Sequence, residues 1–238
     1  MVCLLTAPTS SAQTSEAELA RRGFPVPARE TNVSVRSGPA PSDLYRDGTW
    51  EEFAPPERSL HAAIFDPVRS RLLVFGGVGE CGEFQGGVWS YDLRGHGGWS
   101  LINPDGDPPQ RTAGLTAVYD AKNDRVVTFG GFSSFLGINA EVWILELRGS
   151  PRWHKLQTLN SPPARWFHSA VYDPVHQRMI AFGGRNSSGL LGDLWILDLG
   201  DHPEWVALVA IGPAPSARNA HSAVYDPEID SMILLRPV

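Results

Sequence analysis

The chain has little cysteine and lacks both basic clusters and long apolar runs. Its 238 residues include only Cys3 and Cys81, too few for a disulfide framework, and we expect both to be free thiols. The net charge of −6, without any stripe of lysine and arginine, argues against a nucleic-acid-binding surface. No apolar run approaches the ~20 residues that a membrane-spanning helix needs. These absences favour a globular chain with no nucleic-acid partner and no membrane span.

Turn-forming and aromatic residues are abundant instead. The chain contains 24 Gly, 20 Pro and 8 Trp, with 42% hydrophobic and 19% charged residues. Many tryptophans together with many turn-formers favour short strands and tight loops over helices.

Residues 1–47 are predicted to be a leader and linker, largely disordered. The stretch "MVCLLTAPTSSAQTS" is briefly apolar and has small residues but no basic start. It is either the remnant of a secretory signal peptide cleaved after Ala12 or a disordered leader. Residues 13–47 are rich in Pro, Ser, Ala and Arg without a sustained period, which is typical of a linker. The folded domain is therefore expected at residues 48–238.

From residue 50 onward the sequence repeats itself every 52 to 54 residues. The arginines and aspartates held in phase are Arg58, Arg111, Arg165 and Arg218, and Asp66, Asp120, Asp173 and Asp226. The glycines and tryptophans held in phase are Gly76, Gly77, Gly130, Gly131, Gly183 and Gly184, then Trp89, Trp143 and Trp195, then Trp99, Trp153 and Trp205. A period of about 50 residues indicates a propeller or a solenoid.

Each unit is predicted to form four strands. "HAAIFD", "GLTAVYD" and "HSAVYD" are first strands, each followed by a tight turn of the "DPVRS" kind. The second strand ends in a diglycine, as in "RMIAFGG", and the third alternates around a Trp, as in "DLWILDL". The fourth begins at the second Trp. Four antiparallel strands make one propeller blade, so we expect blades at 58–110, 111–164 and 165–217 and a partial one at 218–238.

The diglycine, the third-strand Trp and the second Trp about ten residues later resemble the kelch repeat, over residues 50–238. The resemblance implies an all-β, kelch-type β-propeller of the galactose oxidase/kelch-like superfamily, with about three complete four-stranded blades and a partial fourth. The "AVYDP…FGG" phrasing is similar to kelch proteins of bacterial type, many of them exported. We therefore expect an extracellular or periplasmic location, with a cytoplasmic one as the alternative.

The repeated residues have structural explanations. Glycine is the residue that cheaply adopts φ > 0 where backbones come close, and the tryptophans are expected to fill the space between blades. His61, His168 and His221 follow the repeat arginine by three residues, with Gly114 in that place in the second unit. Histidines at equal phase in separate blades are more simply explained by a repeated structural hydrogen bond than by a metal ring, and we expect no metal and no cofactor.

One face of the disc is predicted to bind the ligand. The loops between strands two and three and the links from strand four to the next strand one share this face and vary freely, as recognition loops do. The candidate ligand-binding residues are Arg58, Arg111, Arg165, Arg218, Phe84, Phe132, Phe135, Arg185 and Asn186, with Glu83 beside them. For the arginines, an inter-blade salt bridge or a backbone bond is the alternative role. The expected partner is a protein, a peptide or a glycan.

Three functions remain open. The first is a non-enzymatic kelch module for binding or scaffolding. The second is a galactose-oxidase-like or sugar-modifying enzyme, for which the copper ligands available are Tyr91, Tyr119, Tyr172 and Tyr225, with Cys81 for the cross-link. No nucleophile, base and orienting group can be assembled from spacing alone, so no catalytic residue is assigned.

The third is a fragment of a larger kelch protein. The fourth copy departs from the repeat at its diglycine, where Arg236-Pro237 stand in the place of Gly183-Gly184. Residues 49–53 resemble an orphan fourth strand that precedes the first blade. An open array exposes an apolar face and a strand edge, through which self-association is expected.

Overall fold

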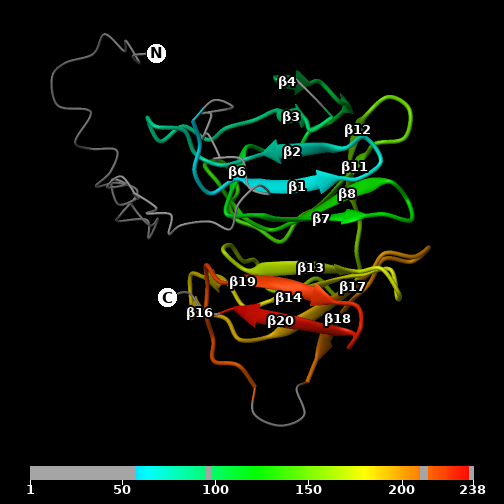
Figure 1. The fold of residues 1–238 in the computed structure, drawn as a ribbon. Helices are drawn as coiled ribbons and strands as arrows, with labels where there is room; N and C mark the ends of the chain where they lie inside the picture. The colour runs from blue at the N-terminus through cyan, green and yellow to red at the C-terminus, as the bar shows by residue number, and fades with distance from the viewer. Residues whose placement is uncertain (1–56, 95–97, 210–213, 236–238) are drawn as a thin grey trace, which may run out of the picture.

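The computed structural model describes residues 57–94, 98–209 and 214–235, and all regular structure in them is β-strand (Figure 1). Three sheets of four long strands and a final two-stranded sheet follow one another along the chain. This confirms the predicted all-β propeller with a partial fourth blade, and the described residues do not close it into a ring. The predicted leader, the orphan strand at residues 49–53 and the ending at Arg236-Pro237 lie outside the described residues.

Each blade runs as a simple antiparallel meander. The long strands are β1 (Ala62–Asp66), β2 (Arg71–Phe75), β3 (Val88–Asp92) and β4 (Trp99–Ile102); β7 (Thr116–Asp120), β8 (Arg125–Phe129), β11 (Val142–Glu146) and β12 (Arg152–Leu156); β13 (Ser169–Asp173), β14 (Arg178–Phe182), β17 (Leu194–Asp198) and β18 (Trp205–Leu208); β19 (Ser222–Asp226) and β20 (Ser231–Leu235). One short strand, β5 (Asp105–Gly106), leaves the first blade and pairs in parallel with β12 of the second. The link therefore joins the sheet of the blade that it enters.

Side-chain alternation explains these strands. In β1 the burial pattern alternates strictly, as a half-buried strand requires, with Ala62, Ile64 and Asp66 buried and Ala63 and Phe65 exposed. The second strands β8 and β14 are buried at four of their five positions, because both faces of these strands are covered by neighbouring blades.

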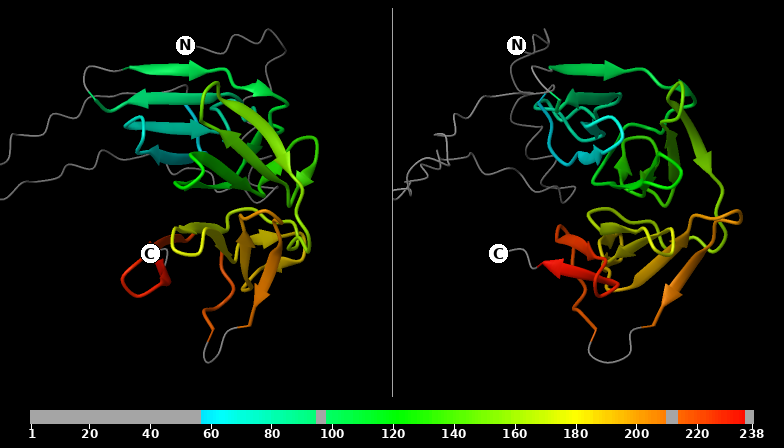
Figure 2. Two further views of the ribbon diagram at one scale, coloured as in Figure 1. Left: turned by 90° about the vertical axis from the view of Figure 1, so that its right-hand side faces the viewer. Right: turned by 45° about the vertical axis from the view of Figure 1, so that its right-hand side comes forward.

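The blades are arranged along an open arc, with the first strands β1, β7 and β13 on its inner side and β4, β12 and β18 on its outer side (Figure 2). Two buried clusters fill the junctions between blades. One joins residues of the first and second blades, such as Phe75 and Trp153, and the other joins residues of the second and third, such as Phe129 and Trp205. Blades of this kind bury their faces only against their neighbours.

Short strands pair the strand 2–3 loops with the links from strand four to the next blade, so both lie on one face, as the antiparallel order of the strands predicts. The short strands are β6 (Thr112–Ala113), β9 (Phe132–Ser133), β10 (Gly137–Ile138), β15 (Arg185–Asn186) and β16 (Gly189–Leu190). The link strand β6 pairs with the loop strand β9, and an isolated bridge joins Trp166 of the next link to Arg185. We call this side, with the strand 2–3 loops and the links, the loop face. The opposite side, with the turns between first and second strands, is the turn face.

The diglycines hold adjacent blades together through the backbone. Gly130 has φ +64°, and a Cβ on it would lie 2.6 Å from the carbonyl oxygen of Arg165 in the next link. Gly131 N–H donates a hydrogen bond to that same oxygen at 2.8 Å. The same arrangement recurs at Gly76-Gly77 with Thr112 and at Gly183-Gly184 with Arg218. Only glycine combines this φ with such a close approach of two backbones.

The repeat tryptophans occupy two kinds of place. Trp153 and Trp205 are 4% and 1% exposed, and their rings lie 6.2 Å from Phe75 and 4.6 Å from Phe129 of the preceding blade. The third-strand residues Trp143 and Trp195 are partly buried against the same two clusters. In the first blade, which has no described blade before it, Trp89 is partly buried and Trp99 packs on Tyr91 at 5.2 Å.

A pair of alanine substitutions tests the diglycine contact. Gly130→Ala is expected to lower the free energy of unfolding by about 3 kcal/mol or more, since the new Cβ would clash with the carbonyl of Arg165. The matched control is Gly149→Ala, because Gly149 also has a positive φ (+68°) but no atom lies within 4 Å of its Cβ position. It should lose only about 1 kcal/mol. Equal losses in urea unfolding would contradict the inter-blade role.

Candidate functional site: the loop face

The structure corrects the repeat register in the second blade. The carbonyl that accepts the diglycine bond belongs to Arg165 and Arg218 in the later links, but to Thr112 in the second blade's link. Thr112, not Arg111, therefore occupies the repeat-arginine position. The spacing in the sequence indicates an extra residue, because Arg111 precedes Asp120 by nine positions, whereas Arg165 precedes Asp173 by eight.

The extra residue also moves the histidine position. Gly114 N–H donates to Leu60 O, and Phe167 N–H donates to Gly114 O, so these three residues are equivalent, each with a positive φ. The residue in the histidine position of the second blade is therefore Leu115, and not Gly114. Leu115 packs against the cluster that contains Ala62 of the first blade, so this junction is apolar where the others carry a histidine.

Arg165 is part of the blade interior. Its side chain is fully buried, and Nη1 donates to Gly183 O at 3.0 Å and to Asp193 Oδ1 at 2.8 Å, while Nη2 donates to Asp193 Oδ2 at 2.8 Å. Burial alone would raise the pKa of Asp193, but hydrogen bonds from Arg165 and Trp195 hold that pKa below its usual value. Arg165 therefore ties the link to the strand 2–3 loop and is not available to a ligand, which corrects its assignment as a binding residue.

The remaining repeat arginines differ in their surroundings. Arg58 is partly buried, which lowers its pKa, and Nη1 donates to Gly76 O at 3.2 Å as Arg165 does to Gly183. Arg218 donates from Nε to Ser216 O at 3.0 Å. Arg111 is exposed, and its side chain lies where a Cβ on Gly86 would come within 3.2 Å of Nε. Among the four predicted arginines, Arg111 has the most exposed setting in the described structure.

An aromatic row crosses the three blades beneath the loop face. The ring centroids of Phe84 and Phe132 are 5.8 Å apart, those of Phe132 and Trp166 are 5.6 Å apart, and Trp166 stacks on Phe167 at 4.1 Å. The row packs with Val78 and Ala113 as a small buried cluster. Phe84 and Phe132 thus belong largely to this layer. Trp166, which is out of phase with the repeat, is a member that periodicity could not identify.

The strand 2–3 loops of the second and third blades expose apolar side chains. Phe135 is 80% exposed, and Leu136 beside it and Leu190 of the third blade are 41% and 54% exposed. Arg185 lies over the ring of Trp166, 5.9 Å from its centroid. Asn186 uses its Oδ1 to accept the N–H of Ser188 and so shapes its own hairpin. Of the predicted aromatic candidates, Phe135 presents the largest accessible surface.

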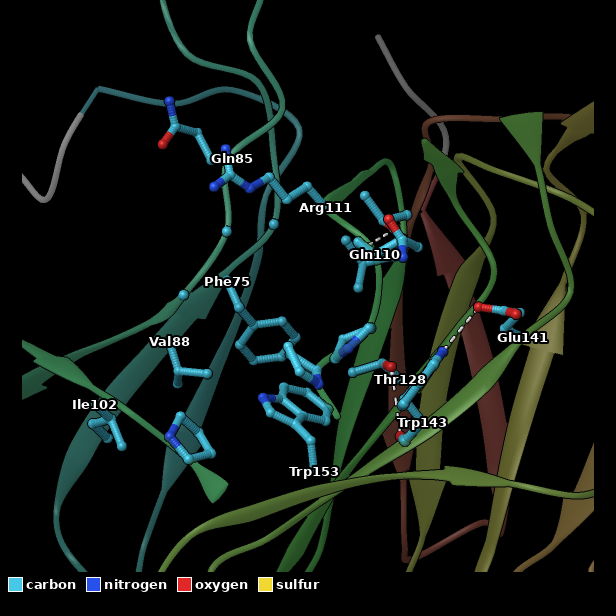
Figure 3. A pocket seen from close by; sticks show the side chains of 18 of the residues that line it. Phe75, Gln85, Val88, Ile102, Gln110, Arg111, Thr128, Glu141, Trp143 and Trp153 are labelled. Atoms are coloured by element: carbon cyan, nitrogen blue, oxygen red, sulfur yellow. Dashed lines mark hydrogen bonds between the residues drawn. The ribbon is translucent and has the colours of Figure 1, made fainter. Parts of the chain in front are cut away.

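A pocket of about 230 Å³ lies between the first and second blades at the loop face (Figure 3). Its apolar lining includes Phe75, Val88, Ile102, Leu115 and Trp153. Its polar lining includes Gln85, Gln110, Arg111, Asn139 and Glu141. Gln85 comes from the first blade's strand 2–3 loop, Gln110 and Arg111 come from the link, and Asn139 and Glu141 precede β11, so three segments supply the polar groups. Sequence reasoning missed this pocket because residues of two blades form it.

Comparison with known proteins identifies the family. The KLHDC2/KLHL20/DRC7 Kelch-repeats domain matches residues 95–234, which is more than half of the chain. The chain belongs to the kelch-repeat family. The bacterial type that the sequence suggested stays a prediction.

Several curated relatives are similar to this kelch chain. It is 31% identical to the flagellar outer arm dynein alpha chain of Chlamydomonas reinhardtii, over 66% of this chain and 4% of the relative. It is 31% identical to the F-box/kelch-repeat protein At1g51550 of Arabidopsis thaliana, over 58% of this chain and 30% of the relative. It is 27% identical to the host cell factor homolog hcf-1 of Caenorhabditis elegans, over 71% of this chain and 23% of the relative. The chain thus spans less than a third of each of these relatives.

The turn face of the kelch blades is held by a repeated polar clamp. Asp120 is completely buried and accepts hydrogen bonds from Arg125 Nε of its own blade and from the Tyr172 hydroxyl of the next, both at 2.8 Å. Asp173 likewise accepts bonds from Arg178 Nε and the Tyr225 hydroxyl. Burial and the bond to Asp120 raise the pKa of Tyr172. Tyr119, Tyr172 and Tyr225 therefore hold carboxylates in place, and this geometry lends no support to a copper site built on them.

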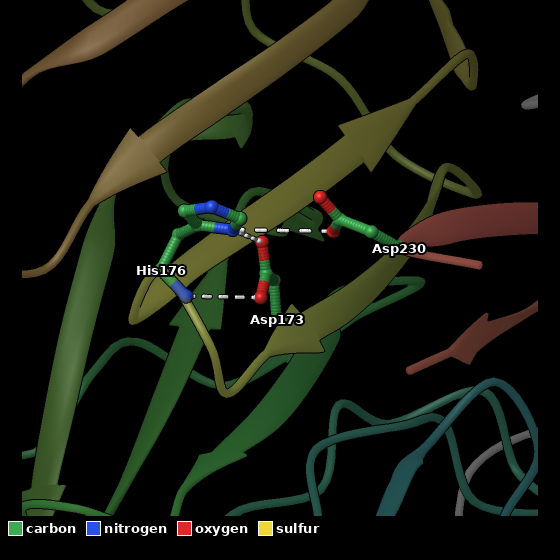
Figure 4. Close-up of side chains that lie close together, drawn as sticks. All are labelled: Asp173, His176 and Asp230. Atoms are coloured by element: carbon green, nitrogen blue, oxygen red, sulfur yellow. Dashed lines mark hydrogen bonds and ion pairs between the residues drawn. The ribbon is translucent and has the colours of Figure 1, made fainter. Parts of the chain in front are cut away.

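One group on this face has the composition of a metal site. Asp173, His176 and Asp230 lie close together (Figure 4), with His176 Nδ1 2.8 Å from Asp173 Oδ2 and 3.9 Å from Asp230 Oδ1. Asp173 Oδ2 is also bonded by Arg178 Nε at 2.7 Å, so a cation already occupies this carboxylate. Burial opposes ionisation of Asp173, but the bonds from His176, Tyr225 and Arg178 lower its pKa overall. We assign the group to the clamp rather than to a metal.

The repeat histidines His168 and His221 each form a hydrogen bond with a hydroxyl of the preceding blade. His168 Nε2 and Thr116 Oγ1 are 2.7 Å apart, as are His221 Nε2 and Ser169 Oγ. His168 is 4% exposed with its ring edge-on to Phe129. Burial, assisted by the charge of Arg165, lowers the pKa of His168 to about 3. These histidines are therefore neutral ties between blades.

The buried His168 predicts an acid sensitivity. Because its folded pKa lies below its ordinary value of 6.5, the unfolded chain takes up the proton first, and the free energy of unfolding falls as pH drops from about 6.5 towards 3. Between pH 7 and pH 5 the wild type should lose about 2 kcal/mol more than His168→Gln. Urea titrations at both pH values measure this difference. Identical pH dependence in both proteins would contradict a buried neutral His168.

Proposed function

We propose that this kelch propeller is a non-enzymatic module that binds a segment of a partner protein through its loop face. The observation that supports it is the exposure of Phe135, Leu136 and Leu190 on the variable strand 2–3 loops, which lie on a layer of backbone-bonded links. Phe135 and Leu136 are adjacent in one loop, and exposed apolar patches are typical of interaction sites. The F-box/kelch-repeat protein among the relatives is named for the same repeat.

The turn face offers a contrast. Its carboxylates, arginines and tyrosines bond one another from blade to blade, and those bonds explain the residues of the clamp without a ligand. A glycan ligand, self-association through the open blade edge and an extracellular or periplasmic location stay predictions.

Peptides selected from a displayed random library against the chain provide a test. The double variant Phe135→Ser with Leu136→Ser is expected to bind them at least about tenfold more weakly, because exposed anchor residues supply most of the energy of such interfaces. The matched control is Val68→Ser with Val175→Ser, which removes two turn-face side chains that are 64% and 63% exposed. This control should bind within about twofold of the wild type.

Either of two results would contradict the proposal: selected peptides that lose binding only in the turn-face control, or a selection that yields no peptide at all. Binding of the chain to immobilised glycans, lost in the loop-face variant, would instead favour the glycan ligand.

A further inference from the structure

The third blade shows what its loop-face interior accommodates. There the guanidinium of Arg165 is fully buried and bonds Pro163 O, Gly183 O and both carboxylate oxygens of Asp193. In the first blade Arg58 also donates to the equivalent carbonyl, that of Gly76. A planar guanidinium is therefore the group for which this place in the blade is shaped.

The second blade keeps the acceptors but lacks the arginine. Thr112 stands in the place of Arg165, and its hydroxyl donates to Gln110 O at 2.6 Å. Gln110, Gly130 and Glu141, the counterparts of Pro163, Gly183 and Asp193, all line the pocket of about 230 Å³. Within the described residues no donor reaches the Gly130 carbonyl oxygen. The pocket thus includes the volume that a guanidinium fills in the third blade.

Glu141 retains capacity to accept. Its Oε2 accepts the Trp143 indole N–H at 3.0 Å, and its Oε1 accepts Lys155 Nζ. A carboxylate has about four lone-pair sites, so two remain. Its side chain is 22% exposed, and the partner Lys155 is 42% exposed, which makes their ion pair one that solvent weakens.

The apolar part of the pocket also suits a guanidinium. Phe75, Trp143 and Trp153 line it, and arginine stacks on aromatic faces more readily than lysine does. Two positive charges oppose this: the exposed Arg111 at the rim and Lys155, which pairs with Glu141. In Figure 3 the Arg111 side chain runs towards Gln85 and away from Glu141. These charges should weaken, rather than prevent, the binding of a cation.

We propose that the pocket between the first and second blades binds an arginine side chain of the partner protein, whose guanidinium takes the place that Arg165 occupies in the third blade. That a partner protein supplies the arginine rests on the proposed function, whereas the binding of an arginine side chain by the pocket is tested without any partner.

The probes are N-acetyl-arginine methylamide and its citrulline counterpart, which has a similar shape but no charge. Indole N–H resonances of ¹⁵N-tryptophan-labelled protein report binding at Trp143 and Trp153. The arginine amide should shift these resonances with a Kd on the order of millimolar. The citrulline amide should bind at least about tenfold more weakly. Equal shifts for both amides, or no shift at up to ten times that Kd, would overturn the proposal.

Variants localise the effect. Thr112→Arg supplies the missing guanidinium and should abolish the arginine-dependent shifts, whereas Ser188→Arg adds the same charge at an exposed loop position and should retain them. Glu141→Gln should weaken binding about tenfold. Arg111→Gln should strengthen it, whereas an anionic ligand would be weakened by the same change. Undiminished binding by both Thr112→Arg and Glu141→Gln would contradict the site.

The filled pocket should also show in stability. Thr112→Arg is expected to raise the thermal midpoint by about 3 °C relative to Ser188→Arg, because it fills a cavity and satisfies the Gly130 carbonyl. If the arginine amide binds as expected but no peptide binds the loop face, the proposed function fails while the pocket chemistry stands. If peptides bind the loop face but the arginine amide does not bind, the pocket proposal fails while the proposed function stands.

Discussion

The hydrogen bond from the second glycine of each diglycine to the next link sets the spacing of this propeller. Gly77, Gly131 and Gly184 each donate to a carbonyl of the following blade at 2.8 to 2.9 Å. The first glycine of each pair has a positive φ and a Cβ position within 2.7 Å of that same oxygen. Since the bond joins backbones, it tolerates any side chain on the link, and Thr112 stands where the other links have arginine.

That tolerance explains how three similar blades can carry different sites. The backbone bonds keep the links in register while the side chains above them change between blades. In the third blade an arginine fills the interior, and in the second a threonine leaves it open. The junction between the first two blades also has Leu115 and Ala62 where the later junctions have a histidine and a hydroxyl, so both members of the pair change together.

Much of the fold could be predicted from the sequence, because the repeat positions report backbone geometry directly. The diglycine, the alternating strands and the tryptophans identify the blades and the face that carries the loops. The site was less accessible to prediction. Anchoring the repeat on Arg111 hid a one-residue insertion between Arg111 and Asp120, and only the hydrogen-bond register reveals Thr112 as its equivalent. The role of Tyr172 was also missed, since its partner Asp120 lies in another blade, 52 residues away.

The hydrogen-bond register also shows that Thr112, and not Arg111, is the residue to compare with Arg165 of the third blade. A repeat array supplies its own reference, because each blade shows what the equivalent place in another blade accommodates. Where the third blade buries a guanidinium against Gly183 and Asp193, the second presents Gly130 and Glu141 without one. The Lys155–Glu141 pair keeps the acid from being left uncompensated, whereas Ala207 of the third blade, the counterpart of Lys155, carries no charge. The open pocket is therefore compatible with a stable blade, and its chemistry follows from the arginine that the neighbouring blade retains.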